Sequence, residues 1–270
     1  LSTLARIAEL ANGRRVDNSA YFTNKFLVTE IIKHLPSYDG QSIRILEPSV
    51  GTGNFLPLLK LKYAACAKVE IDVVDIDSAV LEVLKELVAK MDFPANFSIN
   101  YINDDFLLYP FREKYDLVVG NPPFSKLGAS DKQLQAYRQN AVNKETCNLA
   151  GFFIEKACQL GHSVALIAPK YVLNSPEFTR TRTVLEQHRL DFILDFGENG
   201  FDGVLVETVC LGLLRGESLD APEWYRSQRT FAYGKNKTIF AAANIPIGSF
   251  IETMSLTILP KKWSLAFLTL

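Results

Sequence analysis

The residues with the clearest chemical meaning are Asn121-Pro122-Pro123-Phe124, which follow the apolar run of residues 115–119. The apolar run predicts a buried strand, and the prolines end it because neither can continue a β-ladder or a helix. The result is a stiff corner, since each proline restricts its own φ and the residue before it. This corner offers an amide, a free carbonyl and an aromatic ring. Two acceptors and a stacking surface suit an exocyclic amine on an aromatic ring.

A second motif, residues 47–55, joins a short apolar stretch to a helix-like stretch and contains Gly51 and Gly53. A strand, a glycine-bearing turn and a helix begin a nucleotide-binding α/β unit, where glycines let a ligand approach the backbone. The two glycines alone are equally consistent with a tight connection. Glu47 argues against a phosphate-binding loop, because a carboxylate repels a pyrophosphate and attracts an ammonium group.

Carboxylates also follow the next two predicted strands. Asp75 ends the strand at residues 69–74, where it is placed to hold ribose hydroxyls. The alternative interpretation of Asp75 is a solvated carboxylate at a strand end. Asp104 and Asp105 follow the strand at residues 97–102, and Phe106 comes next. An acid beside an aromatic ring at that position can hydrogen-bond an adenine and pack against it.

The chain around these motifs alternates predicted strands and helices, as in a doubly wound α/β domain. Strands are expected at residues 43–46, 69–74, 97–102, 115–119, 163–167, 193–196 and 204–214, and helices at residues 27–35, 56–67, 78–88 and 149–160. Ser78 is expected to cap the third of these helices, and Ser175-Pro176 to start a further one. The long polar segment 125–147 is either a functional lid or a solvent-exposed insertion that contains a helix.

The two ends of the chain differ from this middle region. Thr23 is expected to cap the helix of residues 27–35, and a second possible role is to face a ligand. From residue 216 onward the alternation stops, and aromatic residues are interleaved with bases, which suits nucleic acid. A small β-rich piece with another partner fits nearly as well. We expect residues 1–215 to form a catalytic domain, with a helical part at residues 1–40, and residues 216–270 to begin a truncated recognition region.

Composition bounds the class of protein. The 270 residues have a hydrophobic fraction of 48% and a net charge of −1, which describe globular material without a global basic field. The four scattered cysteines predict reduced thiols in a cytoplasmic protein, with neither a disulfide frame nor a metal site. No apolar run approaches the roughly 20 residues of a membrane helix, and no signal peptide opens the chain. Because the chain starts with Leu and ends in an apolar segment, both ends are expected to be cuts within a longer polypeptide.

Taken together, residues 47–55 and 120–124 resemble S-adenosylmethionine-dependent DNA adenine-N6 methyltransferases of restriction-modification systems. The order is that of the gamma group, in which the cofactor motif precedes the catalytic motif and the recognition region comes last. The likeness runs from residue 21 to residue 214. It implies an α/β fold with a Rossmann-like, seven-stranded, mostly parallel sheet, helices on both of its faces, and the start of a C-terminal recognition region.

The resemblance also implies which residues bind the cofactor, S-adenosylmethionine. We expect its methionine end to contact Thr23, Glu47, Pro48, Gly51 and Gly53. We expect its ribose to contact Asp75, and its adenine to contact Ile76, Asp105 and Phe106. Asp104 is the alternative to Asp105. The loop departs from the commoner Ala-Cys of the family at Ser49-Val50.

For catalysis, the resemblance implies a target adenine rotated out of double-stranded DNA. The side-chain oxygen of Asn121 and the carbonyl of Pro122 would accept its amine protons, and Phe124 would stack on its ring. Phe124 stands where many relatives carry Tyr. Phe201 is either a second stacking residue or part of a small core. A fused or associated restriction endonuclease is an expected partner.

Two alternatives remain at the level of sequence. The first is an RNA or protein-glutamine N-methyltransferase, because an Asn-Pro-Pro-aromatic corner serves other amines and amides too. The long segment after Phe124 and the extra region past Leu214 favour DNA. The second is a non-catalytic, methyltransferase-like DNA-binding subunit, in which replacing Asn121 with Ala would leave function unchanged.

Overall fold

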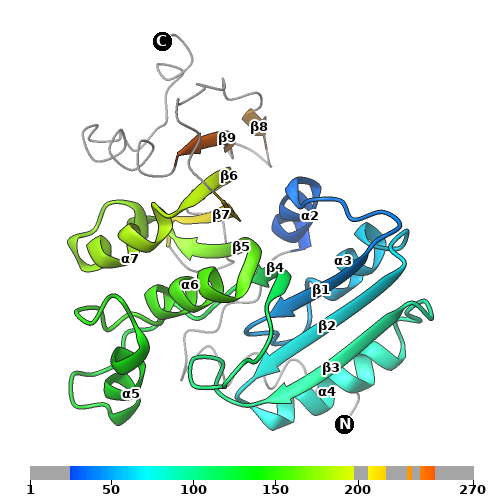
Figure 1. Ribbon diagram of the computed structural model, residues 1–270, viewed down its shortest axis with the longest axis horizontal. Helices are drawn as coiled ribbons and strands as arrows, with labels where there is room; N and C mark the ends of the chain where they lie inside the picture. Colours follow the sequence, from blue (N-terminus) through cyan, green and yellow to red (C-terminus); the bar gives the residue numbers. More distant parts are fainter. Residues whose placement is uncertain (1–24, 198–205, 217–229, 233–237, 247–270) are drawn as a thin grey trace.

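One large β-sheet organises the computed structural model, which describes residues 25–197, 206–216, 230–232 and 238–246 (Figure 1). Nine described strands form the sheet in the order β3-β2-β1-β4-β5-β7-β6-β9-β8. Their bounds are β1 Ser42–Glu47, β2 Lys68–Asp75, β3 Phe97–Asn103, β4 Tyr115–Gly120, β5 Gly161–Pro169, β6 His188–Gly197, β7 Thr208–Arg215, β8 Thr230–Ala232 and β9 Thr238–Pro246.

The first five strands form the parallel half of the sheet. β1 is flanked by β2 and β4, with Ile45 paired to Ile71 on one side and to Leu117 on the other. Parallel strands covered on both faces are apolar nearly throughout, as β4 and β5 are, whereas β2 and β3 alternate polar and apolar residues. Their carboxyl ends share one edge of the sheet, and this is where open α/β sheets bind ligands. The edge brings Glu47 and Asn121 onto adjacent strands.

The other half of the sheet is antiparallel. β7 pairs antiparallel with both β5 and β6, which completes seven strands and confirms the predicted Rossmann-like, mostly parallel architecture. β9 then pairs with β6, and β8 pairs with β9. The described part of the region after residue 216 therefore extends the same sheet. The division of the chain at residue 215 stays a prediction.

Helices cover both faces of the sheet, as Figure 1 shows. Residues of α2 Lys25–His34, α3 Leu56–Lys62 and α4 Ser78–Ala89 join one apolar core. Residues of α5 Lys132–Asn140, α6 Leu149–Leu160 and α7 Thr179–Leu185 join the other, together with the short 3₁₀-helices η1 Lys170–Leu173 and η2 Pro176–Phe178. Burying apolar side chains on both faces stabilises the sheet and fixes the strand ends that carry the polar motifs.

Two predicted helix starts differ from the structure in their caps. Asp77, and not Ser78, caps α4, because its carboxylate accepts a hydrogen bond from the backbone N–H of Ala79 at 2.9 Å. Ser78 is instead the first helical residue. Ser175-Pro176 does precede helical residues, first η2 and then α7, but Ser175 makes no side-chain capping bond.

The second predicted helix, at residues 56–67, is shorter than its pattern indicates. It was expected to reach Ala67, but α3 ends at Lys62 because Tyr63 leaves the helical conformation, with φ −108°. The Tyr63 side chain is fully buried, and its hydroxyl donates to the carbonyl of Pro36 at 3.1 Å. A non-local contact therefore ends the helix where local periodicity would let it continue.

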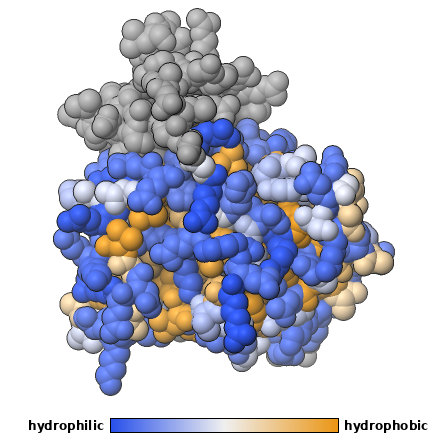
Figure 2. All heavy atoms as spheres, in the orientation of Figure 1, coloured by the Kyte–Doolittle hydropathy of each residue, from blue (hydrophilic) through white to orange (hydrophobic). Residues whose placement is uncertain are grey.

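The outer surface shows no large apolar area in the view of Figure 2, where apolar side chains are scattered in small groups among hydrophilic ones. Within the described ranges, none of the helices has the length and apolar character to cross a membrane. Among the exposed apolar side chains, Ile76 is 62% exposed and lies at the carboxyl edge of the sheet.

Candidate active site

A cavity of about 300 Å³ opens at the carboxyl edge of the parallel strands. This is within the size range of pockets for small ligands. The motifs singled out in the sequence supply most of its wall, and the insertion after β4 supplies the rest. The lining residues used below are Glu47, Pro48, Ser49, Gly51, Asp75, Ile76, Asp77, Asp104, Asp105, Phe106, Asn121, Pro122, Pro123, Gln133, Tyr137 and Phe153.

Glu47 is the most deeply buried polar group of the cavity. It ends β1 and is 1% exposed, and its Oε2 atom has no hydrogen-bond partner among the described residues. Burial raises the pKa of Glu47 well above its ordinary value, and the negative charge of Asp75 raises it further. A buried acceptor that lines a cavity fits a cationic group of a ligand, such as an ammonium.

The glycine turn after β1 is tied directly to β2. The backbone N–H of Val50 donates to the carbonyl of Val74 at 2.9 Å, and that of Gly51 donates to Oδ2 of Asp75 at 3.0 Å. Gly51 and Gly53 have φ of 53° and 74°, values that L side chains rarely adopt. The turn therefore needs glycine for its own path, and the same path keeps its backbone against the cavity.

Asp75 and Ile76 follow one another but face different environments. Asp75 is 7% exposed, and its carboxylate accepts from the backbone N–H groups of Gly51 and Asp77, each at 3.0 Å. Ile76 is 62% exposed and lines the cavity. An exposed isoleucine at the mouth of a cavity offers an apolar surface to a flat ring.

The acidic pair after β3 is ordered by local hydrogen bonds. Oδ1 of Asp105 accepts from the backbone N–H of Leu107 at 2.8 Å, and Oδ1 of Asp104 accepts from the backbone N–H of Asp105 at 2.7 Å. Both carboxylates line the cavity. Phe106 is 2% exposed and packs on Phe153 with ring centroids 4.9 Å apart, so it forms a buried part of the wall.

The proline corner follows β4 and closes the other side of the cavity. Asn121, Pro122 and Pro123 line it, and the hydroxyl of Ser49 donates to the carbonyl of Asn121 at 3.1 Å. Gly120 permits this approach, since a Cβ at this position would meet Cδ of Pro48 at 3.2 Å. The turn after β1 and the corner after β4 are thus in direct contact.

Four of the predicted site residues are not placed against the cavity. Gly53 is buried in the turn after β1 and is not among the lining residues, so its cofactor contact stays a prediction. Phe124 is 8% exposed and packs in the apolar core, and it is not among the residues that line the cavity. Thr23 and Phe201 lie outside the described residues. The stacking roles of Phe124 and Phe201 and the cofactor contact of Thr23 stay predictions.

The insertion after the corner supplies cavity residues that the sequence interpretation missed. Gln133 and Tyr137 come from α5, inside the polar segment 125–147 that was interpreted as a lid or a solvent-exposed insertion. The available signal was the spacing of Leu134 and Tyr137, which are the buried residues of an otherwise polar helix. That spacing predicts an inward face but does not indicate what the face contacts.

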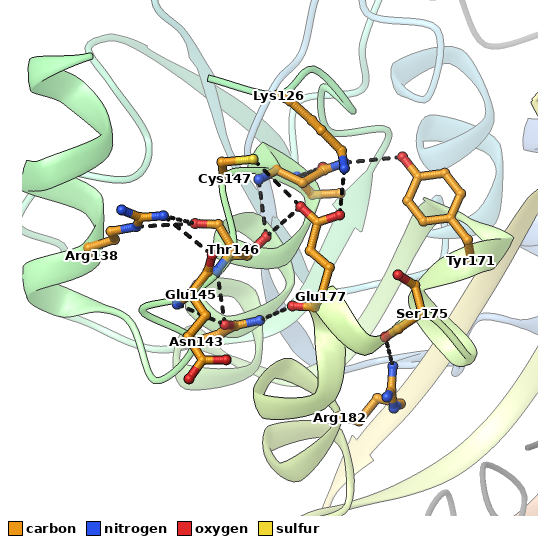
Figure 3. Close-up of polar contacts among 12 residues, drawn as sticks. Lys126, Arg138, Asn143, Glu145, Thr146, Cys147, Tyr171, Ser175, Glu177 and Arg182 are labelled. Atoms are coloured by element: carbon orange, nitrogen blue, oxygen red, sulfur yellow. Dashed lines mark hydrogen bonds and ion pairs between the residues drawn. The ribbon is translucent and has the colours of Figure 1, made fainter. Parts of the chain in front are cut away.

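Polar contacts of Asn143 and Lys126 fasten this insertion to η2 (Figure 3). Asn143 is 1% exposed; its Nδ2 donates to the carbonyl of Glu177 at 2.8 Å, and its Oδ1 accepts from the backbone N–H of Thr146 at 3.1 Å. Lys126 forms an ion pair with Glu177 at 2.7 Å, and Arg138 donates to the carbonyl of Thr146. The insertion is therefore a packed part of the domain.

Comparison with known proteins agrees with this geometry. The Eco57I restriction-modification methylase family matches residues 59–201, more than half of the 270-residue chain. The chain belongs to this family. Its match covers the proline corner and the insertion, and the predicted restriction-modification methyltransferase family is thereby confirmed.

Individual relatives are more distant. The Type II methyltransferase M.VspI of Vibrio sp. (strain 343) is 25% identical over 203 residues, which cover 73% of this chain and 48% of that protein. The tRNA1(Val) (adenine(37)-N6)-methyltransferase of Bacteroides thetaiotaomicron is 34% identical over 99 residues, covering 36% of this chain and 40% of that protein. The chain spans less than half the length of each of these two relatives.

A solved structure supports the fold. The methyltransferase subunit of a type I restriction-modification system from Streptococcus thermophilus superposes with a TM-score of 0.67 at 17% identity, covering 90% of this chain and 59% of that subunit. The chain therefore shares the fold of that methyltransferase subunit.

Proposed function

We propose that this chain transfers a methyl group from S-adenosylmethionine to the N6 amine of an adenine rotated out of double-stranded DNA. The observation that carries the proposal is one cavity lined by both Glu47 and Asn121. One motif suits a cationic cofactor and the other suits an aromatic amine, and methyl transfer requires the two ligands to meet. Membership of the restriction-modification methylase family supports the same activity.

The residues present fit the cofactor. The buried Oε2 of Glu47 suits the ammonium of its methionine end, the acid Asp75 at the end of β2 suits its ribose, and the exposed Ile76 suits its adenine. When bound, the cofactor supplies an electrophilic methyl group on a sulfonium. Because the site already contains a carboxylate of raised pKa, binding of an ammonium is expected to favour loss of the Glu47 proton.

The corner after β4 is proposed to activate the amine. An aromatic amine is a weak nucleophile because its lone pair is delocalised into the ring. Acceptance of its two protons by the Asn121 side-chain oxygen and the Pro122 carbonyl favours a pyramidal nitrogen and localises that pair. The stiff Pro-Pro segment and the Ser49 contact hold these acceptors in place, so catalysis depends on positioning and not on a strong base.

The wider assignments are proposals of the same kind. Residues 1–215 are proposed as the catalytic domain and residues 216–270 as the start of a target-recognition region. The proposed partners are double-stranded DNA and a fused or associated restriction endonuclease, and the proposed location is the cytoplasm. Membership of a restriction-modification methylase family supports DNA and an endonuclease as partners.

The second candidate substrate is RNA. One relative is named as a tRNA adenine-N6 methyltransferase, and it matches 36% of this chain. This relative supports the N6 amine of adenine as the methyl acceptor, and experiment must distinguish DNA from RNA as the substrate. No specific observation favours a protein-glutamine substrate or a non-catalytic subunit over these two.

The test is transfer of labelled methyl groups to double-stranded DNA, RNA and protein, followed by mass spectrometry of the nucleosides. We expect N6-methyladenine in DNA, and we expect Asn121→Ala to abolish it while leaving the affinity for S-adenosylhomocysteine within about twofold. Methylation confined to RNA or protein, methylated cytosine, or full activity in Asn121→Ala would refute the proposal.

A further inference from the structure

The insertion helix α5 touches the cofactor end of the cavity through one residue in particular. Tyr137 is 7% exposed, and its hydroxyl donates to Oδ2 of Asp105 at 2.6 Å. Asp105 is also held by the backbone N–H of Leu107 on Oδ1 at 2.8 Å. The carboxylate is thus fixed from two sides, by its own loop and by a helix 32 residues further along the chain.

The position of Tyr137 is not explained by core packing alone. Its side chain lies between two cavities, because it lines both the one described above and a second cavity of about 420 Å³. Its ring contacts Phe152 at a centroid distance of 5.8 Å. A side chain that borders a cavity on each side is oriented mainly by its directional contacts, and for Tyr137 this contact is the hydrogen bond to Asp105.

The rest of the insertion makes this position well defined. The neck of the insertion is closed by backbone hydrogen bonds from Leu127 to Cys147 and from Leu149 to Ser125, at 2.9 and 3.0 Å. Its far side is fastened by the buried Asn143 network of Figure 3. Tyr137 is therefore presented to Asp105 by a segment with fixed attachments at both ends.

We infer that Tyr137 is a positioning residue, which orients Asp105 so that the site selects a cofactor whose purine carries a 6-amino group. The inference rests on the proposed function. A carboxylate that already accepts two hydrogen bonds directs its remaining lone pairs toward the cavity, where an amine N–H can donate to them. A 6-oxo purine would place an acceptor against these lone pairs and leave buried acceptors unpaired, which is how polar sites discriminate strongly.

The experiment uses the 270-residue chain and isothermal titration with two probes, S-adenosylhomocysteine and its 6-oxo counterpart S-inosylhomocysteine. We expect the wild-type protein to prefer the amino compound. Tyr137→Phe should lower this preference about tenfold, the loss associated with one hydrogen bond to a charged group. The loss should fall on the amino compound, with the affinity for the 6-oxo compound nearly unchanged.

Two control variants separate positioning from a general structural role. Tyr171→Phe removes the hydroxyl that accepts from Nδ2 of Asn148 at 3.1 Å, so it disturbs the insertion away from Asp105, and the preference should persist. In an Asp105→Ala background the preference should be lost, and adding Tyr137→Phe should then change it no further.

The results distinguish a failure of this inference from a failure of the proposed function. If the wild-type protein binds S-adenosylhomocysteine but Tyr137→Phe keeps the full preference, the inference is wrong and the proposed function stands. An equal loss in Tyr171→Phe, or an additional loss from Tyr137→Phe without Asp105, would also overturn the inference. If the wild-type protein binds neither probe, the proposed function fails together with it.

Discussion

At the scale of single residues, Glu47 shows how a binding site can oppose stability. Its carboxylate is fully buried, with one oxygen that has no partner among the described residues, and burial beside Asp75 raises its pKa. In the folded protein it therefore holds a proton at a pH at which the unfolded chain has released it. Stability is fully present below the unfolded pKa and is lost as the pH rises through the folded pKa.

The first prediction concerns Glu47→Gln. Gln cannot ionise, so the variant should have a higher melting temperature than the wild type at pH 8, and its melting temperature should fall less as the pH rises from 5 to 8. Its affinity for S-adenosylhomocysteine should drop by about tenfold or more, because a charge-assisted contact is lost. Calorimetry and titration across this pH range measure both effects.

The control for that prediction is Glu30→Gln. Glu30 is also buried, at 4% exposure, but it is on α2 and does not line the cavity. Its replacement should leave the affinity unchanged. The wild-type affinity should rise with pH as Glu47 loses its proton, and a flat pH profile would contradict the assigned role.

Ser49 gives a second prediction at this scale. Its hydroxyl donates to the carbonyl of Asn121. Ser49→Ala should therefore make the position of the Asn121–Pro122 corner less well defined, without weakening cofactor binding. We expect kcat to fall about threefold to tenfold, consistent with the loss of one neutral hydrogen bond, with little change in the affinity for S-adenosylhomocysteine. Steady-state kinetics with DNA measures this separation. A fall in affinity with an unchanged kcat would argue for a role in binding.

At the scale of elements, the glycine turn after β1 combines an unusual backbone conformation with tight packing. Gly53 has φ +74°, and a Cβ there would lie 2.5 Å from Cδ1 of Leu84. Gly53→Ala should therefore destabilise the protein by the backbone strain plus an overpacking penalty, together about 2–4 kcal/mol. Gly40→Ala is a matched control with φ +72° and no atom within 4 Å, so it should show the backbone strain alone. Equal melting temperatures in the two variants would contradict this.

The insertion gives a prediction at the same scale. Asn143→Ala should remove the side-chain acceptor of the backbone N–H groups of residues 145 and 146, which costs about 2–3 kcal/mol. Hydrogen exchange should accelerate in residues 125–148 and stay slow in the central strands. Asn100→Ala removes an exposed amide bond to Asp72 and should change neither. Uniform acceleration across the sheet would instead indicate global destabilisation.

The insertion also marks the limit of sequence interpretation. The strands were predictable because their apolar residues form either a nearly continuous run, as in β4, or an alternation with polar residues, as in β2. Glu47 and Asp75 stand at the ends of β1 and β2. Tyr137 was missed because its partner Asp105 is 32 residues away, and nothing local indicates that contact. The early end of α3 has the same origin, in the burial of Tyr63. Local patterns predicted the elements, and contacts between distant segments determined the remainder.

At the scale of the whole molecule, the sheet continues across the predicted boundary at residue 215. β6 is a ten-residue strand that pairs with β7 on one side and with β9 on the other. Ending the chain at residue 216 would therefore leave β6 as a long exposed edge, which favours association between molecules. We expect such a truncated protein to form soluble aggregates in size-exclusion chromatography. A monomer with the melting temperature of the full chain would show that β9 contributes nothing.

The pairing of β1 with β4 fixes how far apart Glu47 and Asn121 can lie. The two strands are hydrogen-bonded neighbours, with Leu46 opposite Val118, and one delivers Glu47 while the other delivers Asn121. Adjacent strands lie about 4.8 Å apart whatever their side chains. Main-chain geometry therefore sets the separation between the proposed cofactor site at Glu47 and the proposed amine site at Asn121. Surrounding segments can be exchanged for ones that recognise other targets, and the reacting atoms would still meet at the same spacing.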